Sequence, residues 1–290
     1  MQQEHVMRRS FYVNISLVIV KILSGIFFSS VALIADGIHS TSDLLSDVFV
    51  ILGIRHSVKP PDEEHPFGHG KFEYILSLFL GLTIIFIAYN LGRQVILTWN
   101  DTLKIPGVVS LFVIVVVIVV KLVLARYLIA MGHKMDSEVV SASGQESFTD
   151  VISSAVVFVG VLGVILGNRF DIDWLLYGDK VASVLIALFI IRIGITIIIK
   201  AIISLQGKSV RSEITSTYLE CIEDVPGVLK VDHLDMIAYG PYYQAIVEIR
   251  VDGNISVRDG HEIAHLVHDA LLKNEKICHV VVHVNPGGSK

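Results

Sequence analysis

The residues ADGIHSTSD (35–43) decide how this chain folds, because their pattern returns as ASGQESFTD (142–150). The two stretches, and the residues that follow them, are related by a constant spacing of 107 residues. The identities in this register are Ala35/Ala142, Gly37/Gly144, Ser40/Ser147, Asp43/Asp150, Ser46/Ser153, Val50/Val157 and Gly53/Gly160. So many matches in a single register indicate an internal repeat.

The composition places this repeat in a membrane. Of the 290 residues, 53% are hydrophobic and only 18% are charged, with a mean hydropathy of +0.67. A membrane-spanning helix needs roughly 20 mostly apolar residues, and we predict six: 10–28, 31–57, 73–98, 107–131, 138–167 and 178–204. The second and fifth carry carboxylates, and the repeat spacing and the need for an even number of crossings support them. We therefore predict a membrane all-α six-helix transmembrane bundle over residues 1–207.

The basic residues near the span ends concentrate on one side, which predicts that both termini are cytoplasmic in a multi-pass protein of the inner or plasma membrane. Lys21, Lys121 and Arg192 lie inside spans, where we expect them to snorkel or to pack against partners. The net charge of −5, without a long basic run, argues against nucleic acid as a partner. Cys221 and Cys278 are predicted to be free thiols.

From residue 208 the sequence changes to charged residues mixed with short β-rich runs. We predict a helix at 212–223, strands at 228–238 and 244–251, a helix at 257–273 and a last strand at 278–284. This αββαβ order is typical of a small two-layer α+β unit. The predicted domains are therefore 1–207 in the membrane and 208–290 in the cytoplasm.

The repeat also nominates a binding site. Counting crossings makes the second and fifth spans antiparallel, and the substrate site of an inverted repeat usually lies near the bilayer midplane. His39 and Asp43 face this site from one span, and Glu146 and Asp150 from the other, each pair at i,i+4 spacing. One imidazole and three carboxylates can hold a four-coordinate divalent cation. The alternative is that these groups are buried hydrogen-bonding residues that join the helices.

Two further carboxylates of the second span, Asp36 and Asp47, have no single interpretation. They lie one turn from the predicted ligands. They could be entrance or proton-relay groups, or capped and solvated helix ends.

The second-span stretch 35–40 with Asp43, together with KPPDEEHPFGHGKFE at 59–73, resembles the cation diffusion facilitator family. The resemblance covers nearly the whole chain. It implies a proton-coupled antiporter of Zn, Mn, Fe, Co or Cd that works as a homodimer among membrane lipids, with no prosthetic group and no enzymatic activity. It also implies a ferredoxin-like cytoplasmic domain that binds regulatory divalent metal.

By position, His39 and Asp43 match the family's second-span ligands, and Glu146 and Asp150 occupy its fifth-span pair. Zinc transporters of this family usually carry His or Asp where this chain has Glu146. The extra carboxylate makes the site harder and favours Mn or Fe(II), although Zn also accepts Glu. In the loop after the second span, Asp62, His65 and His69 match a secondary metal site, whose alternative is a solvated loop that holds the topology.

In the tail, Glu248, His261 and His283 align with family ligand positions. Position 232 is Asp where His is familiar, and His233 lies beside it. Because neighbouring strand residues point to opposite faces, we expect only one of Asp232 and His233 to be a ligand. His265 and His268 extend a stripe from His261, which an exposed helix face explains equally well.

The predicted function is export of a divalent transition metal through the His39, Asp43, Glu146 and Asp150 site, with protons competing for the ligands on the far side. Two alternatives belong to other classes. An intramembrane metalloenzyme would need a nucleophile or an HExxH signature, which we do not see. A membrane metal sensor or scaffold of the same fold would bind metal without moving it, and a flux assay separates it from a transporter.

Overall fold

The computed structural model describes residues 2–57, 59, 62–101, 105–134 and 138–287. Within the helices, some side chains are not described either: those of residues 2–4, 46–47, 50–55, 138–139 and 142. The side chain of Asp47 therefore lies outside the described residues. The chain divides into two compact units, residues 1–48 with 80–196 and residues 49–79 with 197–290. Each unit is considered by itself.

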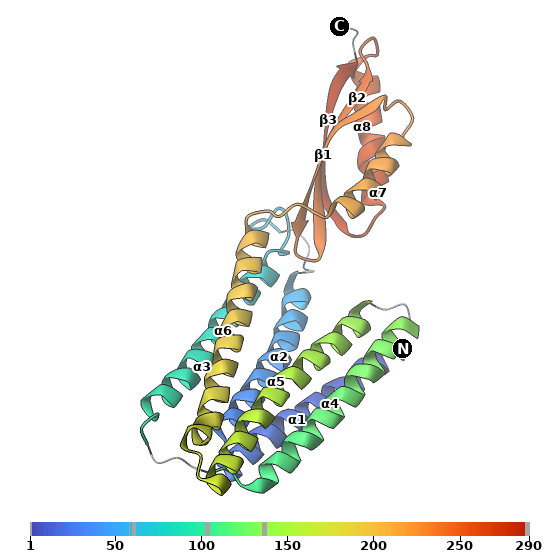
Figure 1. Ribbon diagram of the computed structural model, residues 1–290. Helices are drawn as coiled ribbons and strands as arrows, with labels where there is room; N and C mark the ends of the chain where they lie inside the picture. Colours follow the sequence, from blue (N-terminus) through green and yellow to red (C-terminus); the bar gives the residue numbers. More distant parts are fainter. Residues whose placement is uncertain (1, 58, 60–61, 102–104, 135–137, 288–290) are drawn as a thin grey trace. The chain divides into compact units, whose positions relative to one another are not determined.

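Each predicted span corresponds to one helix (Figure 1), so the predicted six-helix architecture is confirmed. The helices are α1 (Gln2–Phe27), α2 (Val31–Ser57), α3 (Phe72–Leu97), α4 (Val108–Lys134), α5 (Glu138–Phe170) and α6 (Gly178–Leu205), with the short 3-10 helix η1 (Asp173–Tyr177) before the last. Among the described residues, five segments are long and apolar enough to cross a membrane, and α2 is not among them. The described run of α2, residues 31–45, is too short to be counted, because the side chains of 46–47 and 50–55 are left out.

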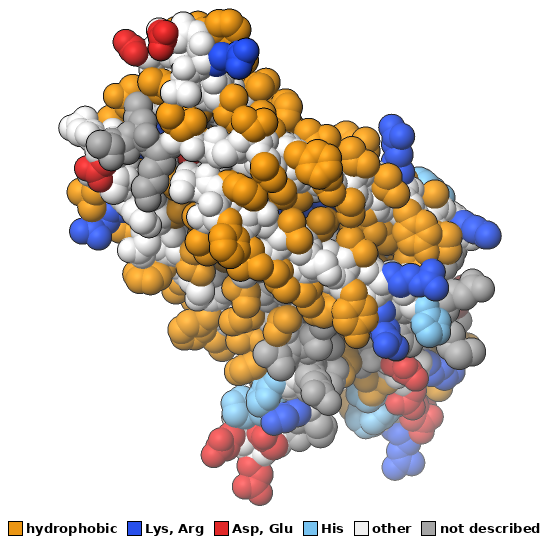
Figure 2. Space-filling model, turned by 90° about the horizontal axis from the view of Figure 1, so that it is seen from below, with side chains coloured by type: hydrophobic (Ala, Val, Ile, Leu, Met, Phe, Trp, Pro, Cys, Tyr) orange, Lys and Arg blue, Asp and Glu red, His pale blue; other side chains and the backbone are white. Residues whose placement is uncertain are grey.

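The outer surface of the helical part is apolar. Large hydrophobic side chains such as Phe86, Phe112 and Val159 are each more than half exposed. Figure 2 shows hydrophobic side chains spread over much of the face that it displays. Water would penalise such a surface and lipid would not, so the chain is a multi-pass membrane protein.

The internal repeat is visible in the packing of α1 on α2 and of α4 on α5. A Cβ added to Gly37 would lie 2.6 Å from Ile22 Cγ1, and one added to Gly144 would lie 2.7 Å from Ile129 Cγ1. Ile22 and Ile129 are related by the same 107-residue spacing as the glycines. The two helix pairs therefore use the same close backbone approach, as predicted from the repeat.

The start of α2 is fixed by a carboxylate from α6. Asp179 accepts hydrogen bonds from Ser30 Oγ at 2.6 Å and from the backbone N–H of Val31 at 2.8 Å. The Ser30 hydroxyl in turn accepts from the N–H of Leu33 at 3.1 Å. These bonds satisfy N–H groups that the first helical turn cannot pair internally. The helix that carries His39 and Asp43 is thus anchored to α6.

The tail adopts the predicted αββαβ order: α7 (Ser212–Glu223), β1 (Lys230–Tyr239), β2 (Tyr242–Asp252), α8 (Val257–Leu272) and β3 (Ile277–Gly287). The sheet order is β1-β2-β3, with β1 antiparallel and β3 parallel to the central strand. Both helices pack on one face of the sheet (Figure 1).

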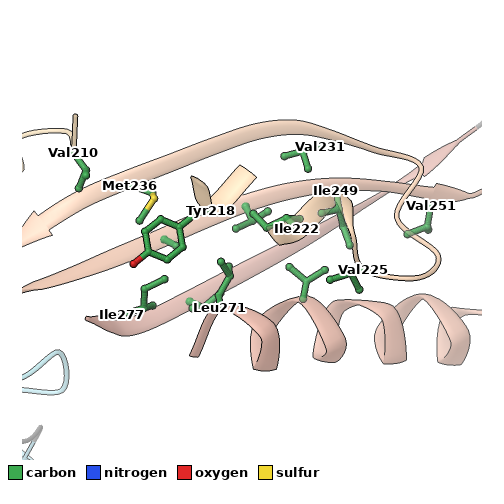
Figure 3. Packing of buried hydrophobic residues seen from close by; sticks show 14 residues of the cluster. Val210, Tyr218, Ile222, Val225, Val231, Met236, Ile249, Val251, Leu271 and Ile277 are labelled. Atoms are coloured by element: carbon green, nitrogen blue, oxygen red, sulfur yellow. The ribbon is translucent and has the colours of Figure 1, made fainter. Parts of the chain in front are cut away.

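The core of the tail lies between the sheet and its helices. Ala245, Val247 and Ile249 are buried, whereas Ile246 and Arg250 point to the open face, as the two-residue period of a strand requires. Figure 3 shows residues of the sheet and of both helices meeting in this core. The open face of the sheet is therefore free to carry polar groups.

Candidate metal centre

Three of the four predicted intramembrane ligands converge between α2 and α5. His39 Nε2 lies 3.6 Å from Asp150 Oδ1, and His39 Nδ1 lies 3.9 Å from Asp43 Oδ2. One ligand atom from each of the three residues lies within 4.8 Å of the others. Donors that share one metal ion at roughly 2.1 Å lie about 3–4 Å apart. The spacing therefore suits a divalent cation.

Three donor atoms of this cluster, on His39 and Asp43, lack a hydrogen-bond partner among the described residues. Both ring nitrogens of His39 and Oδ2 of Asp43 are buried without a hydrogen bond to any described residue. Buried polar atoms are normally paired, because desolvation without a partner is costly. The Phe189 ring of α6 packs edge-on against the imidazole, with ring centroids 5.4 Å apart. The unpaired atoms therefore mark a place for a ligand rather than a hydrogen-bonded helix contact.

The fourth predicted ligand, Glu146, lies at the margin. Its side chain is exposed, and it is not a member of the three-residue cluster. Its carboxylate is nevertheless close enough to Asp43 to interact with it electrostatically. Glu146 is thus near the site without converging on it.

Asp36 is buried rather than solvated, which removes one of the interpretations left open above. It forms an ion pair with Lys21 at 2.8 Å, and neither side chain is exposed. The hydroxyls of Ser153 and Ser154 each donate to its carboxylate at 2.7 Å. Its partners come from both halves of the repeat. The sequence did not predict that Ser153 and Ser154 are the hydrogen-bond partners of Asp36.

Lys121 also has a specific partner. Its ammonium group donates to Asn14 Oδ1 at 2.9 Å and to Asp150 Oδ2, and its side chain is 3% exposed. The sequence allowed snorkelling or packing for this residue. The structure shows packing against partners, one of which is the predicted metal ligand Asp150. The sequence did contain a signal for this contact: Lys121 lies in the middle of a predicted span and is related to Asn14 by the 107-residue repeat spacing.

The predicted loop site is also brought together. His65 Nδ1 lies 3.2 Å from Asp62 Oδ1, and His69 Nε2 lies 3.3 Å from Asp62 Oδ2. One ligand atom from each of the three lies within 4.8 Å of the others, although Asp62 and His65 are about half exposed. The backbone N–H of His65 donates to the Asp62 carboxylate and lowers its pKa. The carboxylate is therefore held in the charged form that a metal ion needs.

The same loop contacts the β1–β2 hairpin of the tail, and both belong to one compact unit. The Tyr239 hydroxyl donates to the Gly68 carbonyl at 3.0 Å, and the Gly240 N–H donates to the Tyr74 hydroxyl at 2.8 Å. A Cβ on Gly70 would lie 2.3 Å from the Tyr239 carbonyl oxygen. The loop that carries His65 and His69, and the start of α3 after it, are thus joined to the tail by hydrogen bonds between tyrosine hydroxyls and backbone groups and by the close approach at Gly70.

The predicted tail ligands divide between the two layers. Glu248 of β2 is paired in register with His233 of β1 and with His283 of β3, so the three form a row on the open face of the sheet. His261 lies on α8, which packs on the other face of the sheet. Within the described part of one chain, no three of these residues bring ligand atoms within 4.8 Å of one another.

The expectation that only one of Asp232 and His233 can reach a given face rests on strict alternation, and a β-bulge interrupts it here. The register shifts between Val231 and His233, which leaves Asp232 as the extra residue. The Asp232 carboxylate accepts from Arg250 Nε at 3.1 Å and forms an ion pair with its guanidinium at 3.0 Å. Asp232 therefore reaches the open face as well, but it is occupied by Arg250.

His261 has a different neighbour within the chain. Its Nε2 atom lies 3.1 Å from Nε2 of His265, one turn further along α8. Two imidazole nitrogens that share one metal ion at 2.0–2.1 Å lie roughly 3 Å apart. The stripe of exposed histidines thus contains a pair with chelating geometry.

Comparison with known proteins agrees with this architecture. Residues 7–205 match the family described as the cation efflux transmembrane domain, and residues 210–287 match the cation efflux protein cytoplasmic domain, which implies dimerisation and metal binding. The chain is 31% identical to the manganese efflux system protein MneP of Bacillus subtilis, over 94% of this chain and 92% of that protein.

Two further relatives extend the comparison. An uncharacterised transporter of Methanocaldococcus jannaschii is 33% identical, over 94% of each chain. The magnetosome protein MamB of Magnetospirillum gryphiswaldense is 29% identical, over 93% of this chain and 89% of that protein. The chain therefore belongs to the cation efflux, or cation diffusion facilitator, family of divalent metal cation transporters.

Proposed function

We propose that this protein is a proton-coupled antiporter that exports a divalent transition-metal ion, with His39, Asp43, Glu146 and Asp150 as the ligands of the transported ion. The observation that carries the proposal is the convergence of His39, Asp43 and Asp150, in which both ring nitrogens of His39 and Oδ2 of Asp43 are buried without a hydrogen bond to a described residue. Glu146 is included because it interacts electrostatically with Asp43 and is the repeat equivalent of His39.

The preferred metal follows from the donors. One imidazole with two or three carboxylates is a harder set than the histidine-rich sites that suit zinc, and it favours Mn²⁺ and Fe²⁺. The similarity to a protein named for manganese efflux supports the same choice. We therefore rank Mn²⁺ first and Fe²⁺ second. Zn²⁺ is third, since it also accepts carboxylate ligands.

The transport cycle requires the ligands to exchange a metal ion for protons. In this proposal both termini lie in the cytoplasm, and the ion enters from that side and binds to deprotonated carboxylates and a neutral imidazole. After the two repeats rock to expose the site outside, protons from that side compete for the same atoms and the ion leaves. The proton gradient then drives net export.

We further propose that the loop and the tail bind regulatory metal in a homodimer. The loop site consists of Asp62, His65 and His69. In the tail, the row of His233, Glu248 and His283 offers one set of ligands, and His261 offers another with His265. Asp232 is left out of this proposal because Arg250 neutralises it.

Uptake of Mn²⁺, Fe²⁺ and Zn²⁺ into proteoliposomes with an imposed pH gradient tests the central proposal. We expect saturable, gradient-dependent flux that Asp150→Ala abolishes. Asp101→Ala, which alters an exposed carboxylate of the turn after α3, should transport like the wild type. Absence of flux for all three metals, or unchanged flux in Asp150→Ala, would overturn the proposal.

A further inference from the structure

Lys121 of α4 lies fully inside the protein, against the transport site. Its side chain is 3% exposed, and its ammonium group is held by Asn14 Oδ1 and by Asp150 Oδ2. Moving an ammonium ion out of water is costly unless it is paired and hydrogen-bonded. Within a span, such a buried charge generally marks an ion pathway. The side chain is therefore not a snorkelling lysine.

The two oxygens of Asp150 have different neighbours. Oδ2 accepts from Lys121, whereas Oδ1 lies 3.6 Å from His39 Nε2 and faces the ligand cluster. Lys121 thus restricts the rotation of the carboxylate and leaves one oxygen for a metal ion. Hydrogen bonds of this kind orient the ligands of metal sites.

The internal repeat shows which negative charge Lys121 offsets. Asn14 and Lys121 are 107 residues apart and occupy equivalent positions of α1 and α4, yet they are hydrogen-bonded to each other. Asp43 and Asp150 are also equivalent, and they too meet in the site. At the remaining pair, the second half has Glu146 where the first has His39. With His39 neutral, each half then carries one net negative charge, because Lys121 offsets the extra carboxylate.

We infer that Lys121 is a positioning residue and a fixed counter-cation of the transport site, which orients Asp150 and weakens metal binding enough for the ion to leave. The inference rests on the proposed function. The Lys121 ammonium group repels the incoming cation. Without Lys121, the carboxylates of Asp43, Glu146 and Asp150 would lose this counter-cation. They would repel one another more strongly in the empty site, and the loaded site would bind its ion more tightly.

Lys21 provides a contrast within the same bundle. It pairs with Asp36 at 2.8 Å, and both oxygens of Asp36 also accept from serine hydroxyls. Among the described residues, both Asp36 oxygens are taken by these donors, and Asp36 is not a member of the ligand cluster. Lys21 also interacts electrostatically with His39, but its hydrogen bonds go to Asp36 and Ser40, whereas those of Lys121 go to Asn14 and to the ligand Asp150 itself.

The test measures Mn²⁺ binding to the full-length protein in detergent, together with the KM and kcat of transport in proteoliposomes. Lys121→Gln keeps a hydrogen-bonding side chain but loses the charge, and we expect its Kd and KM for Mn²⁺ to fall about tenfold while kcat also falls. Lys121→Arg retains the charge and should stay near the wild type. The matched control is Lys180→Gln, which alters a lysine away from the ligand cluster: its ammonium group donates to the carbonyls of Thr98 and Trp99 and lies 6.0 Å from the centroid of the Tyr177 ring.

The outcomes separate this inference from the proposed function. If Asp150→Ala abolishes Mn²⁺ binding but Lys121→Gln leaves the Kd for Mn²⁺ unchanged or raises it, only the counter-cation role is overturned. If the wild-type protein binds no Mn²⁺, Fe²⁺ or Zn²⁺, the proposed function fails first. Should Lys121→Gln not fold, Asn14→Asp, which adds a carboxylate beside Lys121, supplies the second test. It should draw the ammonium from Asp150 and tighten binding, and unchanged or weaker binding would overturn the role.

Discussion

Replacing Lys21 by Met should destabilise the protein by an amount that the structure bounds. Lys21 and Asp36 are both fully buried and their charged atoms are 2.8 Å apart. Removing one partner of a buried ion pair costs about 3–5 kcal/mol, because the other charge is left uncompensated. Asp36 keeps the hydrogen bonds from Ser153 and Ser154, so we expect the lower end, about 3 kcal/mol.

The assay is thermal unfolding of the purified protein in detergent. A loss of about 3 kcal/mol corresponds to a fall in Tm of roughly 6–12 °C for a chain of 150–250 residues, and to a similar or smaller fall here. The double variant Lys21→Met with Asp36→Asn removes both charges and keeps a polar group for the serines. It should recover most of the loss. A Tm of Lys21→Met within about 2 °C of the wild type, or a double variant no more stable than the single one, would refute this reasoning.

Three other variants test the remaining contacts. Gly70→Ala places a Cβ 2.3 Å from the Tyr239 carbonyl oxygen and should lower the free energy of unfolding by about 1–3 kcal/mol, whereas Gly92→Ala, with its nearest contact at 3.6 Å, should melt like the wild type. Partial burial raises the pKa of the Cys278 thiol. In a Cys221→Ser variant, maleimide labelling of Cys278 should therefore be slow near neutral pH and accelerate as the pH rises. Labelling as fast as that of a Cys278→Ser variant, which retains the exposed Cys221, would contradict this. His265→Ala should weaken Ni²⁺ binding by the tail at least tenfold, and His268→Ala should not, if the 3.1 Å pair of His261 and His265 is a chelate; isothermal titration of the full chain measures both.

The sequence by itself determined the architecture. A hydrophobic run of about 20 residues has no stable alternative to a membrane helix, so the six spans were predictable within a few residues, except that α1 begins at Gln2 rather than at residue 10. The tail elements were equally readable, because strand and helix periods differ. The repeat predicted that Asp43 and Asp150 belong together, since equivalent positions of two related halves meet where the halves face each other.

Only the tertiary structure decided which charges neutralise which. Lys21 and Lys121 looked alike in the sequence, yet one pairs with Asp36 and the other with Asp150, a proposed ligand of the transported ion. Glu146 shares its i,i+4 spacing with Asp150, yet its side chain lies exposed at the margin. The β-bulge at Asp232 could not be predicted from the sequence either, because one inserted residue changes the face to which the following side chains point without changing the composition of the strand. Periodicity fixes the face on which a side chain lies, but the identity of its partner depends on how distant helices and strands pack together.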